Sequence, residues 1–158
     1  MAVATHVSRV SKDYAPFGFS VMETASGRIT THATAAVGPG ANLVILTVDD
    51  ADIYIESVQV NPITGATGVI AADNTDFVTV NVTSFTSARA ASTTHATGDT
   101  RAASLNAFAS DTFESLTVAT PVVPAGRVLE IAAVKSVAND VAVNSKVMDV
   151  LVRYRRKA

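Results

Sequence analysis

The sequence predicts an all-β protein, built as an antiparallel β-sandwich or barrel. Val, Ile and Thr together make up roughly a third of the chain, and branching at Cβ favours strands over helices. Short apolar stretches recur at fairly regular intervals between Gly, Pro and Asn residues, which is typical of sandwiches rather than of parallel α/β sheets. The length of 158 residues is sufficient for one domain with a sizeable core.

The N-terminal forty residues differ from the rest. They are rich in Ala, Thr, Ser and Gly, with a strand-like piece at 17–22, a predicted turn at Ser26-Gly27 and a chain break at 38–40 (GPG). One interpretation is a mobile terminus with a short hairpin, and the other is an extended arm that becomes ordered against a neighbouring subunit. We therefore divide the chain into an N-terminal arm, residues 1–40, and a β-sandwich domain, residues 41–158.

Three strands are predicted in the first half of the sandwich domain. Residues 42–48 (NLVILTV) are a continuous apolar run, typical of a strand buried on both faces. Residues 53–60 (IYIESVQV) and 77–82 (FVTVNV) alternate, as strands with two distinct faces do. The alternation places these residues together on one face each: Ile53, Ile55, Ser57 and Gln59; Tyr54, Glu56, Val58 and Val60; Val78, Val80 and Val82.

The second half begins with a polar stretch, residues 83–103, which predicts a long loop. Apolar residues within 105–116 are spaced near the helical period, so a short helix or helical turn is expected there. Residues 121–126 (PVVPAG) predict a turn into a strand over 127–134, and 147–154 is the final strand. In the strand over 127–134, one face is expected to carry Leu129, Ile131 and Ala133.

Composition argues against several classes of partner. Charged residues make up 16% of the chain, against about 25% in typical soluble proteins, so we expect part of the surface to be covered by subunit contact. A net charge of −2 disfavours nucleic-acid binding, which needs a basic field. No apolar run approaches the length of a membrane span, and residues 1–11 lack the pattern of a signal peptide. We expect no nucleic-acid or membrane partner, and a protein that folds in the compartment where it is made.

Acidic residues are the only metal-ligand candidates of note, since the chain has no Cys. Two groups lie in predicted turns: Asp49, Asp50 and Asp52; Asp73 and Asp76. Oxygen ligands on loops suit Ca²⁺, but no Asp-x-Asp-x-Asp-Gly loop with a distal Glu is present. We expect these carboxylates to cap and solvate turns, and we expect no metal and no cofactor.

No catalytic pattern stands out. His6, His32 and His95 each lie in a polar segment without an acidic or His partner at ligand spacing, and are expected to be exposed to solvent. The Gly-x-Ser-x-Gly elbow and the phosphate-binding glycine motifs are missing. The sequence therefore predicts that the protein is not an enzyme, although triads assemble from distant residues and an enzyme on this scaffold stays an alternative.

The C-terminus carries the densest charge, in Arg153, Arg155, Arg156 and Lys157. These cations either lie at a solvent-exposed strand end or bind an acidic partner. As the acidic partner, a neighbouring subunit is preferred to nucleic acid.

From about Ile53 onward, the order of segments resembles a family of small β-sandwich proteins of tailed bacteriophages. The matching segments are IYIESVQVNP, Asp73 to Asp76 followed by FVTVNV, LNAF, SLTVATPVVPAGRVLEI and VMDVLVRY. Val123 to Leu129, with its Val-x-Ala-Gly-x-Val-Leu pattern, is the most recognisable part. Arg127 departs from the pattern, because relatives often carry Asp there.

The resemblance implies a jelly-roll-like sandwich that decorates or cements a capsid, commonly as a trimer. It implies the major capsid protein as partner, a homo-oligomer, and a place on the capsid surface of the virion. An arm and a basic terminus would then form the capsid or subunit interface, with these candidate residues: Val7, Val10, Tyr14, Phe17, Phe19, Arg153, Arg155 and Arg156. The alternative is a head-fibre or tail-associated adhesive module that binds a host glycan through residues 83–103.

Overall fold

Nine antiparallel strands form in the computed structural model, which describes residues 21–31, 42–63, 77–100, 113–136 and 144–157. Within these ranges the protein is all-β, which confirms the predicted fold class. The strands are β1 (Glu23–Thr30), β2 (Leu43–Val48), β3 (Ile53–Pro62), β4 (Val78–Thr86), β5 (Ser92–Asp99), β6 (Glu114–Val118), β7 (Val122–Val123), β8 (Arg127–Lys135) and β9 (Val147–Arg156).

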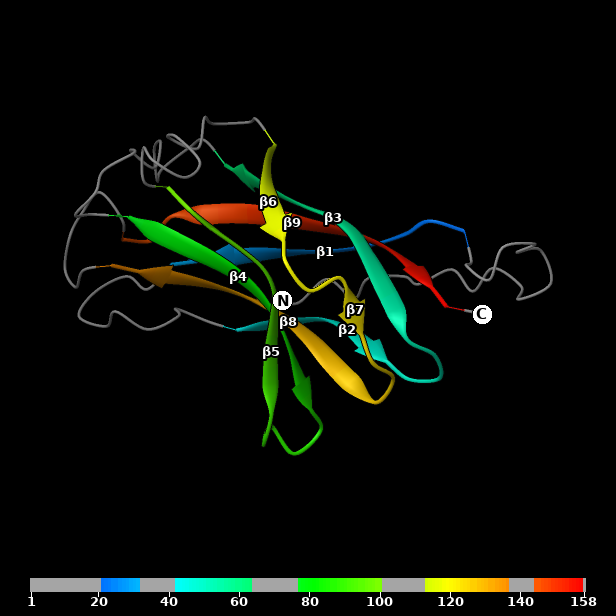
Figure 1. The fold of residues 1–158 in the computed structure, drawn as a ribbon. Coiled ribbons are helices and arrows are strands. Elements are labelled where there is room, and N and C mark those ends of the chain that lie inside the picture. The colour runs from blue at the N-terminus through cyan, green and yellow to red at the C-terminus, as the bar shows by residue number, and fades with distance from the viewer. Residues whose placement is uncertain (1–20, 32–41, 64–76, 101–112, 137–143, 158) are drawn as a thin grey trace.

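The strands pair in the order β1-β9-β3-β6-β5-β4-β8-β2, and β7 adds to β3 (Figure 1). The sheet folds over at β6, which pairs with β3 over three residues and with β5 over two. Half of the sheet, β1-β9-β3-β6, therefore packs against the other half, β5-β4-β8-β2. This division of eight strands is that of a jelly roll, and β6 links the two layers along one side.

The interior between the halves is filled mainly by Val and Ile side chains. Alternate residues of β4 point inward: Val78, Val80 and Val82 share one face, as predicted, and the structure shows that this face is buried. The inward face of β8 carries Leu129, Ile131 and Ala133, also as predicted. Burying each such aliphatic side chain contributes about 1.5–3 kcal/mol, so this core is the main source of stability.

The prediction for the faces of β3 was half wrong, because the strand contains a bulge. The register with β9 shifts between Ile55 and Ser57, so the alternation changes phase there. Val58 and Val60 consequently point into the same core as Ile53 and Ile55. The prediction that β2 is buried on both faces is wrong, because its outer face is exposed. The register of β2 on β8 also shifts, between Val44 and Leu46.

The predicted turn at Ser26-Gly27 is wrong, since both residues lie in the middle of β1. Strand β1 falls inside the range assigned to the arm, yet it pairs with β9 along all its residues. The nearest atoms to a Cβ built on Gly27 would be Leu43 Cδ2 at 2.4 Å and Ile45 Cγ2 at 2.9 Å. Gly27 therefore stands where β1 approaches the facing layer closely, and its lack of a side chain serves packing instead of a turn. The other arm residues, 1–20 and 32–40, lie outside the described residues.

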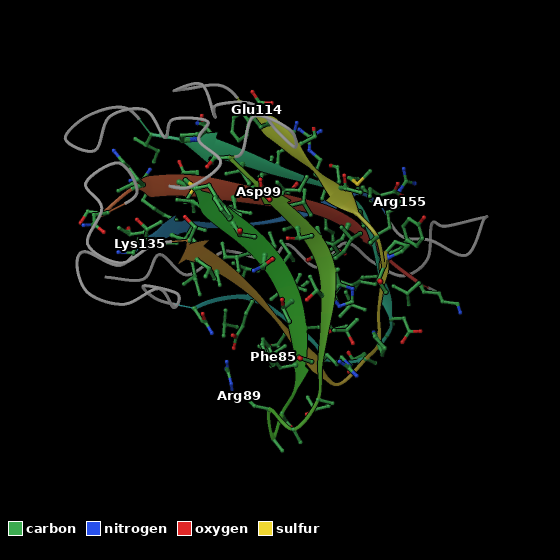
Figure 2. The ribbon with its side chains drawn as sticks, turned by 60° about the vertical axis from the view of Figure 1, so that its left-hand side comes forward. Phe85, Arg89, Asp99, Glu114, Lys135 and Arg155 are labelled. Carbon is green, nitrogen blue, oxygen red and sulfur yellow. The ribbon has the colours of Figure 1, made fainter. Side chains whose placement is uncertain are left out.

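The predicted loop over residues 83–103 is also wrong. Strand β4 continues to Thr86 and returns through a tight connection into β5, so most of this stretch is a β-hairpin. Arg89, in the connection, has a positive φ of 53°, which a short turn requires. Its guanidinium lies over the ring of Phe85, 4.6 Å from the ring centre (Figure 2). The predicted helix over 105–116 lies largely outside the described residues, and its last three residues belong to β6 instead.

Candidate functional site

One end of the sandwich brings together the C-terminal half of β9, the first residues of β3, strand β7 and the start of β1. Tyr54 of β3 pairs with Val122 of β7 on one side and with Arg155 of β9 on the other. Glu23, the first residue of β1, pairs with Tyr154. Four segments far apart in the sequence thus meet at the end where the chain reaches its last residues (Figure 1).

Apolar side chains are exposed at this end. Tyr54 is 36% exposed, and Val122, directly opposite, is 45% exposed. Val21 and Met22 precede β1 and are 57% and 40% exposed. We refer to these four residues, with Arg153 and Arg155 beside them on β9, as the basic-apolar surface. It combines the residue types enriched at protein interfaces, namely Tyr, Met and Arg.

The structure places the three predicted arginines at this end, but in different surroundings. Arg153 is exposed on the outer face, and Arg155 Nε lies 3.0 Å from Glu56 Oε1 without an aligned N–H···O hydrogen bond. Arg156 points to the other face, where its Nε donates a 3.1 Å hydrogen bond to Glu23 Oε1. Arg156 is thus a structural residue, whereas Arg153 and Arg155 can reach a partner. The predicted residues Val7, Val10, Tyr14, Phe17 and Phe19 lie outside the described residues.

Tyr54, Val122 and Met22 were missed by sequence reasoning. The alternation of β3 contained a signal for Tyr54, because Ile53 and Ile55 on the inward face leave the intervening aromatic residue outside. Val122 gave no such signal, since its segment was predicted to be a turn and forms the two-residue strand β7.

Tyr154 anchors this end from the interior. Its hydroxyl donates a 3.1 Å hydrogen bond to Glu23 Oε2, and its ring is buried. Burial, followed by the negative charge of Glu23, raises the pKa of Tyr154 to about 12.

We expect Tyr154 to ionise late in an alkaline titration of the folded protein. The unfolded chain loses this proton near pH 10, while the folded protein holds it until about pH 12. The stability from this shift is therefore fully present below pH 10 and is lost as the pH rises through the folded pKa. An ultraviolet titration of tyrosinate absorbance should show a late step in the wild type and none in Tyr154→Phe. A wild-type titration without this late step would contradict the environment described for Tyr154.

Of the predicted acidic groups, Asp52 caps a turn, as expected. Asp52 Oδ1 accepts a 3.0 Å hydrogen bond from the Ala125 amide, and the Asp52 carbonyl accepts one of 2.8 Å from the Lys157 amide. Within the described ranges, no group of three or more His, Cys, Asp or Glu residues could hold a metal ion. Asp73 and Asp76 lie outside the described residues.

The prediction that His95 is exposed is wrong, because its side chain is completely buried. Its Nε2 lies 2.7 Å from Ser84 Oγ, and its Nδ1 lies 2.6 Å from the Thr120 carbonyl oxygen. A carbonyl can only accept, so Nδ1 carries the proton and Nε2 accepts from the Ser84 hydroxyl. The distance is that of a nucleophile and its base, but Ser84 is fully buried and the base is oriented by a carbonyl instead of a carboxylate. His6 and His32 lie outside the described residues.

A second ionic contact covers the outer face of the opposite layer. Arg89 binds the carboxylate of Glu130 with both terminal nitrogens, one of them at 2.9 Å. Glu130 is only 3% exposed although it points away from the core, because Arg89 and Phe85 cover it. This pair fixes the β4–β5 hairpin to β8.

Comparison with solved structures gives distant likeness in fold. No family model matches the chain, and no curated protein matches it. A solved chain described as "Cyanophage Pam1 capsid asymmetric unit" is similar over 97% of this chain and 98% of that chain, with 15% sequence identity and a TM-score of 0.49. Within the described residues, no helix is long and apolar enough to cross a membrane. A likeness this distant gives no indication of function.

Proposed function

We propose that the protein is a virion structural protein, which decorates a phage head and stabilises it by bridging capsid subunits. The sequence pattern shared with tailed-phage decoration proteins from Ile53 onward supports this proposal, and so does the jelly-roll order of the strands. Its partner would be the major capsid protein, and the protein itself would act as a homo-oligomer, with a trimer preferred. Residues 1–20, which join the domain at Val21, would serve as an arm.

The observation that carries the proposal is the basic-apolar surface. Single exposed apolar residues are common on monomeric proteins, but adjacent ones bordered by cations typically mark a contact with another protein. Tyr54 and Val122 are paired neighbours across two strands, and Arg155 is the neighbour of Tyr54 on the other side. These side chains stand on paired strands and lose little conformational freedom when a partner covers them.

The proposal includes no catalytic role. A cement protein acts through contact area alone, and the buried Ser84–His95 pair is a structural contact between β4 and β5. Loss of activity on capsids should therefore follow surface substitutions and leave the fold intact.

The double variant Tyr54→Ser/Val122→Ser should bind heads of the encoding phage at least about tenfold more weakly than the wild type, because buried interface anchors each contribute more than about 1 kcal/mol. Co-sedimentation of purified protein with heads that lack it measures the affinity and the copy number per capsid subunit. The fold of the variant is checked by circular dichroism.

Val44→Ser is the matched control. Val44 is 50% exposed on the outer face of β2, in the other layer, so the substitution removes a similar exposed apolar side chain away from the basic-apolar surface. Binding equal to wild type is expected for the control. An equal loss in both variants, or unchanged binding of the double variant, would refute the assignment of the surface. Binding of the wild type to host-cell glycans but not to heads would favour the adhesive alternative.

A further inference from the structure

The side chain of His95 points into the core because β5 contains a bulge at this residue. The register of β5 on β4 shifts between Val82 and Thr83, whose partners are Ala96 and Thr94, so His95 is the extra residue. The bulge lets the imidazole enter the interior beside Ser84. Bulges often direct a side chain toward a particular contact. Here the imidazole is directed toward the segment that follows β6.

His95 holds this segment with both its main chain and its ring. The His95 carbonyl accepts hydrogen bonds from the amides of Ala119, at 2.9 Å, and Thr120, at 3.3 Å. The ring donates from Nδ1 to the carbonyl of Thr120. Few other contacts bind the segment to β5, because the β5–β6 ladder has only two residue pairs. His95 is thus the main attachment of residues 119–120 to β5.

The attachment continues directly into the basic-apolar surface. After Thr120, the Pro121 carbonyl accepts a 2.8 Å hydrogen bond from the Ile55 amide, and Val122 pairs with Tyr54. One residue, Pro121, therefore separates Thr120 from Val122, an exposed member of that surface. A change at Thr120 reaches Val122 through the backbone.

The surroundings of the ring favour its neutral form. Burial is the largest cause that lowers the pKa of His95, the hydrogen bond to Thr120 opposes it, and the positive charge of Arg127 lowers it further. Ser84 faces the ring from β4, Arg127 from β8 and the Thr120 carbonyl from the β6–β7 connection. Arg127 Nη1 lies 3.4 Å from Ser84 Oγ and 3.3 Å from Thr93 Oγ1. A proton on Nε2 would deprive the Ser84 hydroxyl of its acceptor and place two cations around one oxygen.

We propose that His95 is a proton-sensitive latch, whose protonation in mild acid releases residues 119–120 from β5. Release breaks the hydrogen bonds at Ala119 and Thr120 and lets the imidazolium reach water, while the strands on either side keep their ladders. Val122 stays paired with Tyr54, but the segment that leads into it is no longer held by β5, so the basic-apolar surface loses this support. The consequence for partner binding rests on the proposed function, but the latch itself does not.

Hydrogen exchange of the free protein tests the latch without any partner. Protection factors of the Ala119 and Thr120 amides should fall by up to about tenfold for each pH unit below the ordinary histidine pKa, because the open form binds one proton more than the closed form. Amides in the central ladders, such as those of Val80 and Val152, should keep their protection over the same range. The titration of His95, followed by NMR of its Cε1–H group, should have the same midpoint as the opening.

Two variants test whether protonation of His95 opens the latch. His95→Asn keeps a donor near Nδ1 and cannot be protonated, so the protection of Ala119 and Thr120 should no longer depend on pH. Arg127→Met retains His95 and removes the neighbouring cation, so the midpoint should move to higher pH. The latch is overturned by pH-independent protection in the wild type, by an equal acid response in His95→Asn, or by a loss of protection that spreads evenly over all strands. Binding to heads can then be compared at neutral pH and in mild acid. If the latch opens as expected but binding is the same at the two pH values, the latch stands and its coupling to the basic-apolar surface fails.

Discussion

Gly27→Val should lower the free energy of unfolding by about 3 kcal/mol, the upper part of the range for overpacked cores. The Cβ of any side chain at this position would lie 2.4 Å from Leu43 Cδ2, 2.9 Å from Ile45 Cγ2 and 3.2 Å from Ile131 Cδ1. The leucine methyl can rotate away. The Ile45 Cγ2 methyl can move only by rotation about χ1, which is restricted in a β-branched residue, so β1 would have to separate from β2. Urea denaturation followed by circular dichroism measures the loss.

Ser26→Val is the control for Gly27→Val, because it places the same side chain one residue earlier on the exposed face of β1. Its effect should stay within about 0.5 kcal/mol, as for most surface substitutions. If Gly27→Val unfolds at the same urea concentration as the control, β1 does not approach the facing layer as closely as described. The outcome also decides whether the segment around Gly27 contributes to the domain.

Arg89→Met should lower the free energy of unfolding by about 1–3 kcal/mol, because it leaves the buried carboxylate of Glu130 without its partner. The Glu130 side chain is 3% exposed and the Arg89 side chain 55%, so water that enters after the substitution limits the loss. Glu130→Gln in the Arg89→Met background should recover part of the stability, since the buried charge is then removed. The double-mutant cycle from urea denaturation at pH 7 gives the coupling between the two side chains.

Arg28→Met provides the comparison for Arg89→Met. Arg28 also binds a carboxylate through two nitrogens, at 2.8 Å and 3.2 Å from Asp149, but both side chains are well exposed. An exposed ion pair of this kind contributes about 0–1 kcal/mol. Equal losses in Arg28→Met and Arg89→Met would show that burial of Glu130 adds nothing to the pair, which would contradict the description of this contact.

Much of the fold was predictable wherever the side-chain alternation was regular. The valines of β4 and the inward residues of β8 are buried as their pattern indicates, and the final strand occupies the predicted segment. Predictions failed where a bulge changed the phase. Val58 and Val60 moved to the inner face by the bulge in β3, and His95 entered the core through the bulge in β5.

Small polar residues misled the prediction for a different reason. Ser, Thr and Gly are common in turns, so Ser26-Gly27 and the stretch from Thr83 were assigned to turn and loop. Both are in strands, because a neighbour supplies the ladder: β9 for β1 and β8 for β4. Pairing with a distant strand overrides a weak local preference.

Only part of the basic-apolar surface could be identified from the sequence. Local sequence identified the C-terminal arginines, since their charge is visible without any partner. It did not identify the exposed Met22, nor Val122, whose importance comes from lying beside Tyr54 at the meeting point of four segments.

The amino-acid sequence by itself determined the all-β class, most strand positions and the inward faces of β4 and β8, because these depend on residue type and a local period of two. Only the tertiary structure decided the phase beyond each bulge, the burial of His95, the close approach at Gly27 and the composition of the basic-apolar surface. Each of these depends on which distant strand lies alongside, and hydrogen-bonded pairing between distant strands leaves no periodic trace within either strand alone.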